Sequence, residues 1–129
     1  MKKKLLLLFV SLLTMVILAA CGADDDNNSS TGKQVLKVGM EAAYAPFNWS
    51  QNDDSNGAVK IGDSKEYAAG YDVEIAKRIA DGLDMELEIV KTDWDGLIPS
   101  LQSGAIDVII AGMSPNEERL ETIDFTDIY

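Results

Sequence analysis

The sequence contains no histidine and only one cysteine, Cys21. Without histidine, the chain lacks the imidazole on which most zinc sites and Ser-His-Asp hydrolases depend. With one cysteine, it can form neither an intrachain disulfide nor a cysteine cluster around a metal. The segment Asn52–Asp63 loosely imitates a calcium loop, but it departs from that motif at its first, ninth and last positions. We therefore expect no metal site and no cofactor.

Basic residues are also scarce. Lys and Arg together number 11, against 22 Asp and Glu, which gives a formal net charge of −11. Such a surface disfavours contact with nucleic acid and with anionic lipid head groups. We therefore expect no nucleic-acid partner, and any attachment to a membrane has to come from something other than the protein surface. The acidic surface alternatively serves solubility alone.

The first 34 residues read as a leader and a tether. Lys2–Lys4 precede the apolar run Leu5–Ala20, which has the basic start and short length of a secretory signal rather than of a spanning helix. The run ends in Leu18–Cys21, which resembles the bacterial lipobox, and this implies a diacylglycerol on the Cys21 thiol. An ordinary buried thiol at the end of a membrane anchor is the alternative. Residues 22–34 are polar and without periodicity, as in a flexible tether.

The remaining residues, 35–129, suffice for one small core. Their pattern predicts strand, helix, strand, helix, strand, which is the order of a parallel α/β sheet. A long loop, residues 41–56, follows the first strand, and a helix begins with Asp72 as its N-cap. The expected elements are a strand at Val35–Met40, a helix at Asp72–Leu83 with an apolar stripe of Val73, Ala76, Ile79, Ala80 and Leu83, a strand at Met85–Ile89, a helix at Trp94–Gln102 interrupted by Pro99, and a strand at Ala105–Ala111.

A possible anion site follows the last of these strands. Gly112 lets a backbone approach a ligand closely, Ser114 offers a hydroxyl, and Arg119 offers a planar fork of donors that matches a carboxylate. Ligands of open α/β sheets lie at this end of the strands. Alternatively, Ser114 only caps a helix that begins with Pro115, and Arg119 is a surface charge. Ile123–Thr126 is expected to be a further strand.

Four ordered motifs resemble the N-terminal lobe of bacterial extracellular solute-binding proteins of family 3, the polar amino-acid class that serves ABC importers. They are Tyr44–Phe47, Gly70–Ala76, Asp93–Leu101 and Gly112–Thr126. The resemblance implies a lobe of the type II periplasmic-binding-protein fold, with a mostly parallel sheet, truncated before the second lobe. It covers roughly residues 35–129.

The resemblance also implies a role for individual residues. Tyr44 and Trp94 would be aromatic walls around the ligand side chain, and Gly112 would be a backbone contact. Ser114 and Arg119 would hold the α-carboxylate of the ligand. Glu41 occupies the position of an acidic residue that contacts the ligand side chain in this family, although it is equally well interpreted as a solvated loop charge.

The implied function is capture of a polar or charged L-amino acid for an ABC permease, by a monomer anchored through lipid to the extracytoplasmic face of the cell membrane. With the second lobe missing, we expect weak binding by this chain alone. No catalytic residue is expected. One alternative is a periplasmic dehydratase or murein-cleaving enzyme related to the binding fold, for which Glu41 is the only local acid. Another is a sensory or adhesion lipoprotein.

Overall fold

The computed structural model describes residues 32–128. The chain divides into two units, Met1–Gly32 and Lys33–Tyr129, and the second contains every helix and strand described below. The expected signal sequence, the lipobox with Cys21 and most of the expected tether lie outside the described residues. Within residues 32–128, no helix has both the length and the apolar character needed to cross a membrane.

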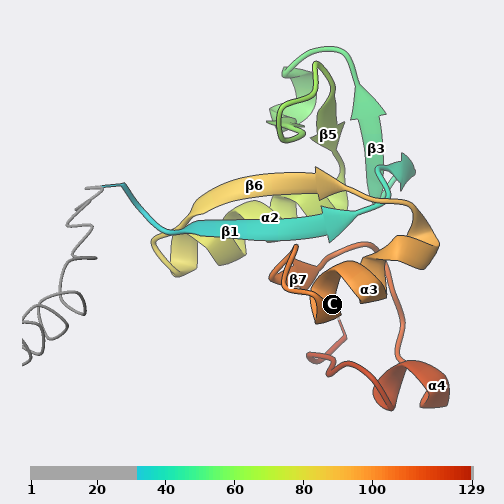
Figure 1. The fold of residues 1–129 in the computed structure, drawn as a ribbon. Helices are drawn as coiled ribbons and strands as arrows, with labels where there is room; N and C mark the ends of the chain where they lie inside the picture. The colour runs from blue at the N-terminus through green and yellow to red at the C-terminus, as the bar shows by residue number, and fades with distance from the viewer. Residues whose placement is uncertain (1–31, 129) are drawn as a thin grey trace, which may run out of the picture. The chain divides into compact units, whose positions relative to one another are not determined.

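The second unit contains two small sheets, three α-helices and two short 3₁₀ turns (Figure 1). The elements are, in order, β1 (Val35–Met40), β2 (Ala43–Tyr44), β3 (Asn48–Gln51), η1 (Ser55–Gly57), β4 (Val59–Lys60), β5 (Tyr67–Ala69), α2 (Tyr71–Gly82), β6 (Glu86–Lys91), η2 (Trp94–Gly96), α3 (Leu97–Gln102), β7 (Val108–Ile109) and α4 (Glu117–Leu120).

The first sheet has three parallel strands in the order β6-β1-β7. Strand β1 pairs with β6 over its whole length and with β7 at Val38 and Gly39. The side chains of Val38, Met40 and Ile89 are completely buried, as expected of strands covered on both faces. The predicted parallel α/β order is therefore confirmed.

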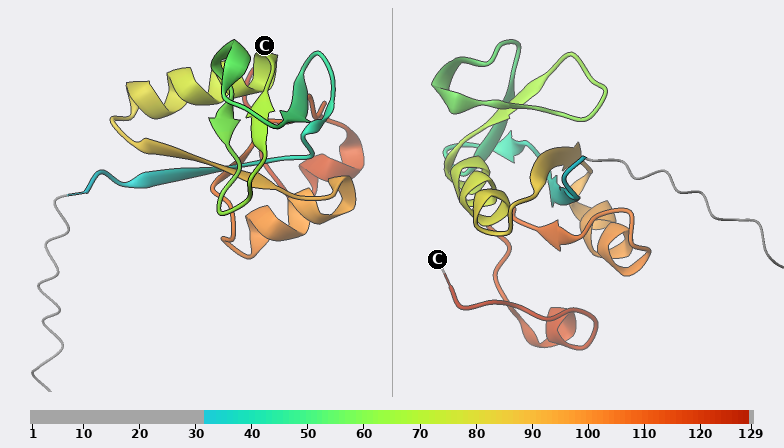
Figure 2. Two further views of the ribbon diagram at one scale, coloured as in Figure 1. Left: turned by 90° about the horizontal axis from the view of Figure 1, so that it is seen from above. Right: turned by 90° about the vertical axis from the view of Figure 1, so that its left-hand side faces the viewer.

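Helices α2 and α3 lie on opposite sides of this sheet (Figure 2, right). Helix α2 buries Val73, Ala76 and Ala80, as its apolar stripe predicts. The prediction that the whole stripe is buried was wrong for Ile79 and Leu83, which remain 39% and 58% exposed. Leu83 is the C-cap that follows the last residue of the helix, and Ile79 lines an open pocket beside β7.

The second sheet is antiparallel, with four strands in the order β2-β3-β5-β4. The prediction of an uninterrupted loop over residues 41–56 was wrong, because this segment contains β2 and β3. Strand β3 finds its partner in β5, where Trp49 lies opposite Ala69. The calcium-like segment Asn52–Asp63 contains η1 and β4, and the latter also pairs with β5.

The start of helix α2 and the interruption predicted within the next helix differ from expectation. Helix α2 begins at Tyr71 with Gly70 as its N-cap, and Asp72 is buried in the first turn instead of capping it. Helix α3 continues through Pro99, because a proline in the first turn sacrifices no intrahelical hydrogen bond. The interruption lies earlier, at Gly96, where η2 ends.

Two predicted strands were also revised. Only Val108–Ile109 of the expected strand at residues 105–111 pairs with β1, although Ile106, Ile110 and Ala111 are buried beside it. Residues 123–126 have no regular secondary structure. Backbone hydrogen bonds to β1 extend to Asp107 and Ile110, so the apolar run correctly indicated burial but overestimated the length of the strand.

Candidate functional site

A pair of stacked aromatic rings lies at the turn between β2 and β3. Tyr44 ends β2 and Phe47 immediately precedes β3, and their ring centroids are 5.2 Å apart with an interplanar angle of 20°. Both rings remain accessible to solvent, with Tyr44 51% and Phe47 37% exposed. An exposed aromatic pair offers flat apolar area without loss of many rotamers, which suits contact with a ligand.

Gly112 brings the backbone after β7 against this aromatic pair. Its φ of +61° lies in the left-handed region that favours glycine. A Cβ at this position would lie 3.5 Å from Cε1 of Tyr44. Gly112 therefore lies against the ring of Tyr44, while its expected role as a backbone contact to the ligand stays a prediction.

Helix α4, which carries Arg119, is capped by Asn116. The backbone N–H of Arg119 donates to Oδ1 of Asn116 at 2.8 Å, and the helix is a single turn. The prediction that Ser114 is the N-cap was therefore wrong. Asn116 has the extended backbone required of a cap, whereas Ser114 lies two residues further from the helix.

The guanidinium of Arg119 is held by two contacts. Its Nη1 donates to the backbone carbonyl of Ser114 at 2.7 Å, and its Cζ lies 5.4 Å from the ring centroid of Trp94. Arg119 is half-buried, and one bond to a carbonyl leaves other N–H groups of the fork available. The structure therefore brings together Trp94, Ser114 and Arg119, which belong to two separate motifs.

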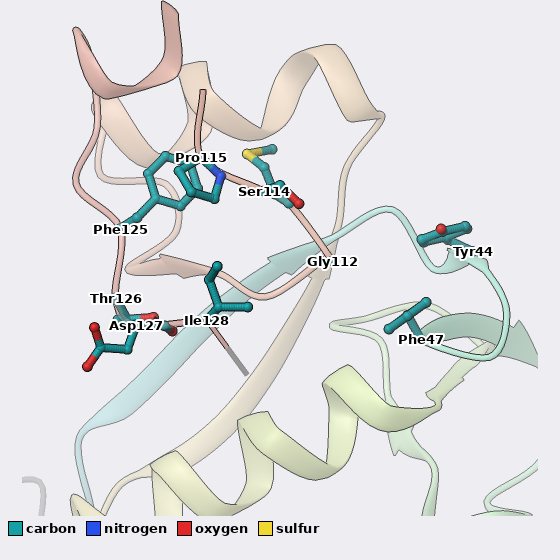
Figure 3. A pocket seen from close by; sticks show the side chains of 10 residues that line it. Tyr44, Phe47, Gly112, Ser114, Pro115, Phe125, Thr126, Asp127 and Ile128 are labelled. Atoms are coloured by element: carbon teal, nitrogen blue, oxygen red, sulfur yellow. Dashed lines mark hydrogen bonds between the residues drawn. The ribbon is translucent and has the colours of Figure 1, made fainter. Parts of the chain in front are cut away.

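These residues line two neighbouring pockets. The aromatic pocket, of about 330 Å³, is shown in Figure 3, with Tyr44 and Phe47 on one side of Gly112 and Phe125 on the other. The arginine pocket, of about 360 Å³, contains Trp94 and Arg119. The aromatic pocket is lined by Tyr44, Phe47, Gly112, Met113, Ser114, Pro115, Phe125, Thr126, Asp127 and Ile128, and the arginine pocket by Trp94, Asp95, Ile98, Met113, Asn116, Glu118, Arg119 and Thr122.

Met113 lines both pockets and so separates the two predicted walls, Tyr44 and Trp94. Sequence reasoning missed Met113, and it named Phe47 only as part of a motif. Glu41, half-buried just after β1, is among the lining residues of neither pocket in the described chain, and its proposed contact with a ligand stays a prediction. The signal in the sequence was the position of Met113, an apolar residue between two predicted site residues, Gly112 and Ser114.

Comparison with known sequences gives the family. The profile of the bacterial extracellular solute-binding proteins, family 3, matches residues 36–129. The arginine-binding extracellular protein ArtP of Bacillus subtilis is 36% identical over 99 residues, which are 77% of this chain and 34% of that protein. A probable histidine-binding protein of Campylobacter jejuni is 40% identical over 73% of this chain and 32% of its own length. The chain thus spans about a third of these relatives.

Solved structures give the same result for the fold. An arginine-bound form of domain 1 from TmArgBP, carrying a Phe57Trp mutation, superposes with a TM-score of 0.60 and 44% identity over 74% of this chain and 64% of that one. Holo ArgBP from T. maritima superposes with a TM-score of 0.60 and 41% identity, over 74% of this chain and 37% of its own. With the profile covering nearly the whole folded unit, the chain belongs to the bacterial extracellular solute-binding proteins of family 3, and it corresponds to their N-terminal part.

Proposed function

We propose that this chain captures a polar or cationic L-amino acid as the substrate-binding component of an ABC importer. The observation that carries the proposal is the guanidinium of Arg119, held between the carbonyl of Ser114 and the ring of Trp94. A planar fork with donors to spare suits a carboxylate, which accepts two parallel hydrogen bonds from it. The Ser114 hydroxyl lies in the same segment and would supply a further donor to the α-carboxylate.

The side chain of the ligand would lie along the aromatic surfaces. Tyr44 and Phe47 offer one stacked pair, and Trp94 offers a third ring. Gly112 has no side chain that would fill the space beside Tyr44. Aromatic faces attract cations such as a guanidinium. The names of the relatives, which include arginine-binding and histidine-binding proteins, support a basic amino acid, with Glu41 as its proposed acidic partner.

The affinity of this part alone is proposed to be weak. The chain spans about a third of its relatives, so contacts made by their remaining residues are absent from it. Association also costs translational and rotational freedom that few contacts offset. The arginine-bound state named for domain 1 of TmArgBP supports an affinity that is measurable nonetheless.

Anchoring and partnership belong to the same proposal. Cys21 would carry a diacylglycerol and hold the monomeric protein at the extracytoplasmic face, next to the permease of the importer. A Cys21→Ser variant should move from the detergent phase to the aqueous phase in a detergent partition experiment. The relatives described above are named as binding proteins, which supports a binding role over the enzymatic alternatives.

The test is a fluorescence titration of the full gene product in mild detergent, with L-arginine, L-histidine, L-lysine, L-glutamine and L-cystine. The sequence has two tryptophans, Trp49 and Trp94, and a Trp49→Phe background makes Trp94 the reporter. A saturable change with one of these amino acids supports the proposal. Silence with all five in a folded protein contradicts it.

Arginine variants locate the site. Arg119→Ala should weaken binding about 10- to 100-fold, because a charge-assisted bond to the ligand is lost. Arg119→Lys should restore little, since an ammonium cannot form the bidentate fork. Arg78→Ala, at an exposed position of α2, is the matched control and should leave affinity unchanged. Equal losses in Arg78→Ala and Arg119→Ala would show a general charge effect.

A further inference from the structure

Two fully buried polar side chains lie behind the aromatic pair without lining either pocket. Asn48, the first residue of β3, and Asp72, in the first turn of α2, are both 0% exposed, and they are the buried polar side chains of the described chain. Nδ2 of Asn48 donates to Oδ2 of Asp72 at 2.7 Å. A hydrogen bond in such surroundings is costly to break, because each group then loses a partner away from water.

The same place joins the aromatic turn to helix α2 through the backbone. The N–H of Tyr71 donates to the carbonyl of Pro46 at 3.2 Å, and the N–H of Asp72 donates to that of Phe47 at 2.8 Å. The first N–H groups of a helix have no partner within the helix, and here the turn supplies it. The backbone between Tyr44 and Asn48 is therefore fastened to the start of α2.

Gly70 makes this junction possible. Its φ of +127° is a conformation that side chains rarely adopt, and a Cβ on it would lie 2.3 Å from the carbonyl oxygen of Phe47. The chain therefore passes Phe47 at a distance that only glycine permits. On the other side of the turn, Tyr44 and Phe47 are exposed to solvent. The position of the ring pair is thus fixed from the buried side.

We propose that Asn48 and Asp72 are positioning residues for ligand recognition: their buried hydrogen bond fixes the Tyr44–Phe47 ring pair at the aromatic pocket and thereby sets affinity for the amino acid. This inference rests on the proposed function for its ligand. Neither residue lines the aromatic or the arginine pocket. Their effect is transmitted through the backbone of residues 45–47, which carries the second ring and turns the chain from β2 into β3.

The experiment compares variants of the pair in the full gene product, with L-arginine as the probe. Asn48→Ala removes the donor and should weaken binding at least tenfold. The double exchange Asn48→Asp with Asp72→Asn restores one donor and one acceptor in reversed order, and it should recover most of that loss. Asn48→Ser, a milder change, serves if Asn48→Ala does not fold, with an intermediate loss expected.

The matched control is Ala80→Gly, at a 2% exposed position in the last turns of the same helix. It should lower the unfolding temperature as the Asn48 variants do, because glycine weakens a helix, while leaving the dissociation constant within twofold. Equal effects of Asn48→Ala and Ala80→Gly on affinity, at equal loss of unfolding temperature, would overturn the proposal and leave the pair a purely structural one.

A second readout does not need a ligand. The ring resonances of Tyr44 in an NMR spectrum report on the stack with Phe47, since a neighbouring ring shifts them. They should move in Asn48→Ala, return in the double exchange, and stay unchanged in Ala80→Gly. If the wild-type protein binds none of the five amino acids, the proposed function fails, and these resonances decide the positioning inference alone. Unmoved resonances in Asn48→Ala would refute it.

Discussion

In the parallel sheet, β1 pairs with β6 along six residues, from Val35 opposite Glu86 to Met40 opposite Lys91, whereas the antiparallel pairings each extend over two or three residues. The parallel sheet is held by apolar burial from two helices. Of its apolar side chains, the antiparallel sheet buries only the small ones of Ala68 and Ala69, and it adds polar links, among them the buried bond between Asn48 and Asp72. The first sheet supports the arginine side of the site, and the second carries the aromatic side.

The contrast between the two sheets shows how the exposed Tyr44–Phe47 pair can be kept in place without being buried. Tyr44 and Phe47 have to remain accessible if they are to meet a ligand, so their own apolar area cannot hold the turn. Hydrogen bonds to the start of α2 do this instead. Stability and recognition therefore depend on different kinds of interaction in the two sheets, and each can be tested separately.

Shortening a core side chain of the parallel sheet should have the largest effect. Ile89 is 0% exposed, and Ile89→Ala should lower the free energy of unfolding by about 2–5 kcal/mol, because it removes buried methyl groups and leaves a cavity. Val59→Ala, at a half-buried position of β4, should cost clearly less. Denaturant unfolding measures both variants. Equal losses would contradict the contrast between the sheets.

Gly70→Ala tests the junction between the aromatic turn and the start of α2. The left-handed φ alone should cost about 1–3 kcal/mol, and the contact with the Phe47 carbonyl should in addition displace the aromatic turn. Gly82→Ala, where a Cβ meets nothing within 4 Å, is the matched control. Unfolding and near-ultraviolet circular dichroism measure the two effects. Unchanged aromatic dichroism in Gly70→Ala would count against the proposed junction.

A smaller effect is expected from the charged link between the sheets. Nζ of Lys91 in β6 donates to Oγ of Ser50 at 3.0 Å and to Oε2 of Glu66 at 3.1 Å. Lys91→Met should lower stability by less than about 1 kcal/mol, since both charged side chains are well exposed. The loss should shrink in high salt. A loss that is large and independent of salt would show that this link, too, is structural.

The smallest effect is expected from Asp53, in the loop after β3. Hydrogen bonds from the Ser55 hydroxyl and backbone hold the pKa of this carboxyl below its ordinary value of 3.8. A carboxyl with a lowered pKa stabilises the fold at pH values above its ordinary pKa, and this contribution disappears as the pH falls through the folded-state pKa. Asp53→Asn should therefore differ from wild type in thermal unfolding at neutral pH but converge with it in acid. A difference that stays constant as the pH falls below the ordinary pKa of the carboxyl would contradict this assignment.

The parallel half of the fold could be predicted because its signals are local. The alternating and β-branched runs around Val38 and Ile89 indicate buried strands, and the spacing of Val73, Ala76 and Ala80 indicates a covered helix face. Each pattern lies within a single element. The expected length of the strand around Val108 was wrong, because burial and pairing do not end at the same residue.

The antiparallel half could not be predicted in the same way. Strands β2 and β4 contain two residues each, which is too short for an alternating pattern. The bond between Asn48 and Asp72 joins residues 24 positions apart, and nothing in either local sequence indicates burial of a polar side chain. In the candidate site, motif resemblance predicted roles for Arg119 and Gly112, but the position of Met113 in both pockets depends on packing.

The contacts of Arg119 also determine when its freedom is lost. A free arginine side chain has many rotamers, and fixing it costs entropy. In this structure the ring of Trp94 and the carbonyl of Ser114 restrain the guanidinium. Folding therefore bears the cost of ordering this long cation, and the carboxylate of the proposed ligand would meet donors that are already aligned.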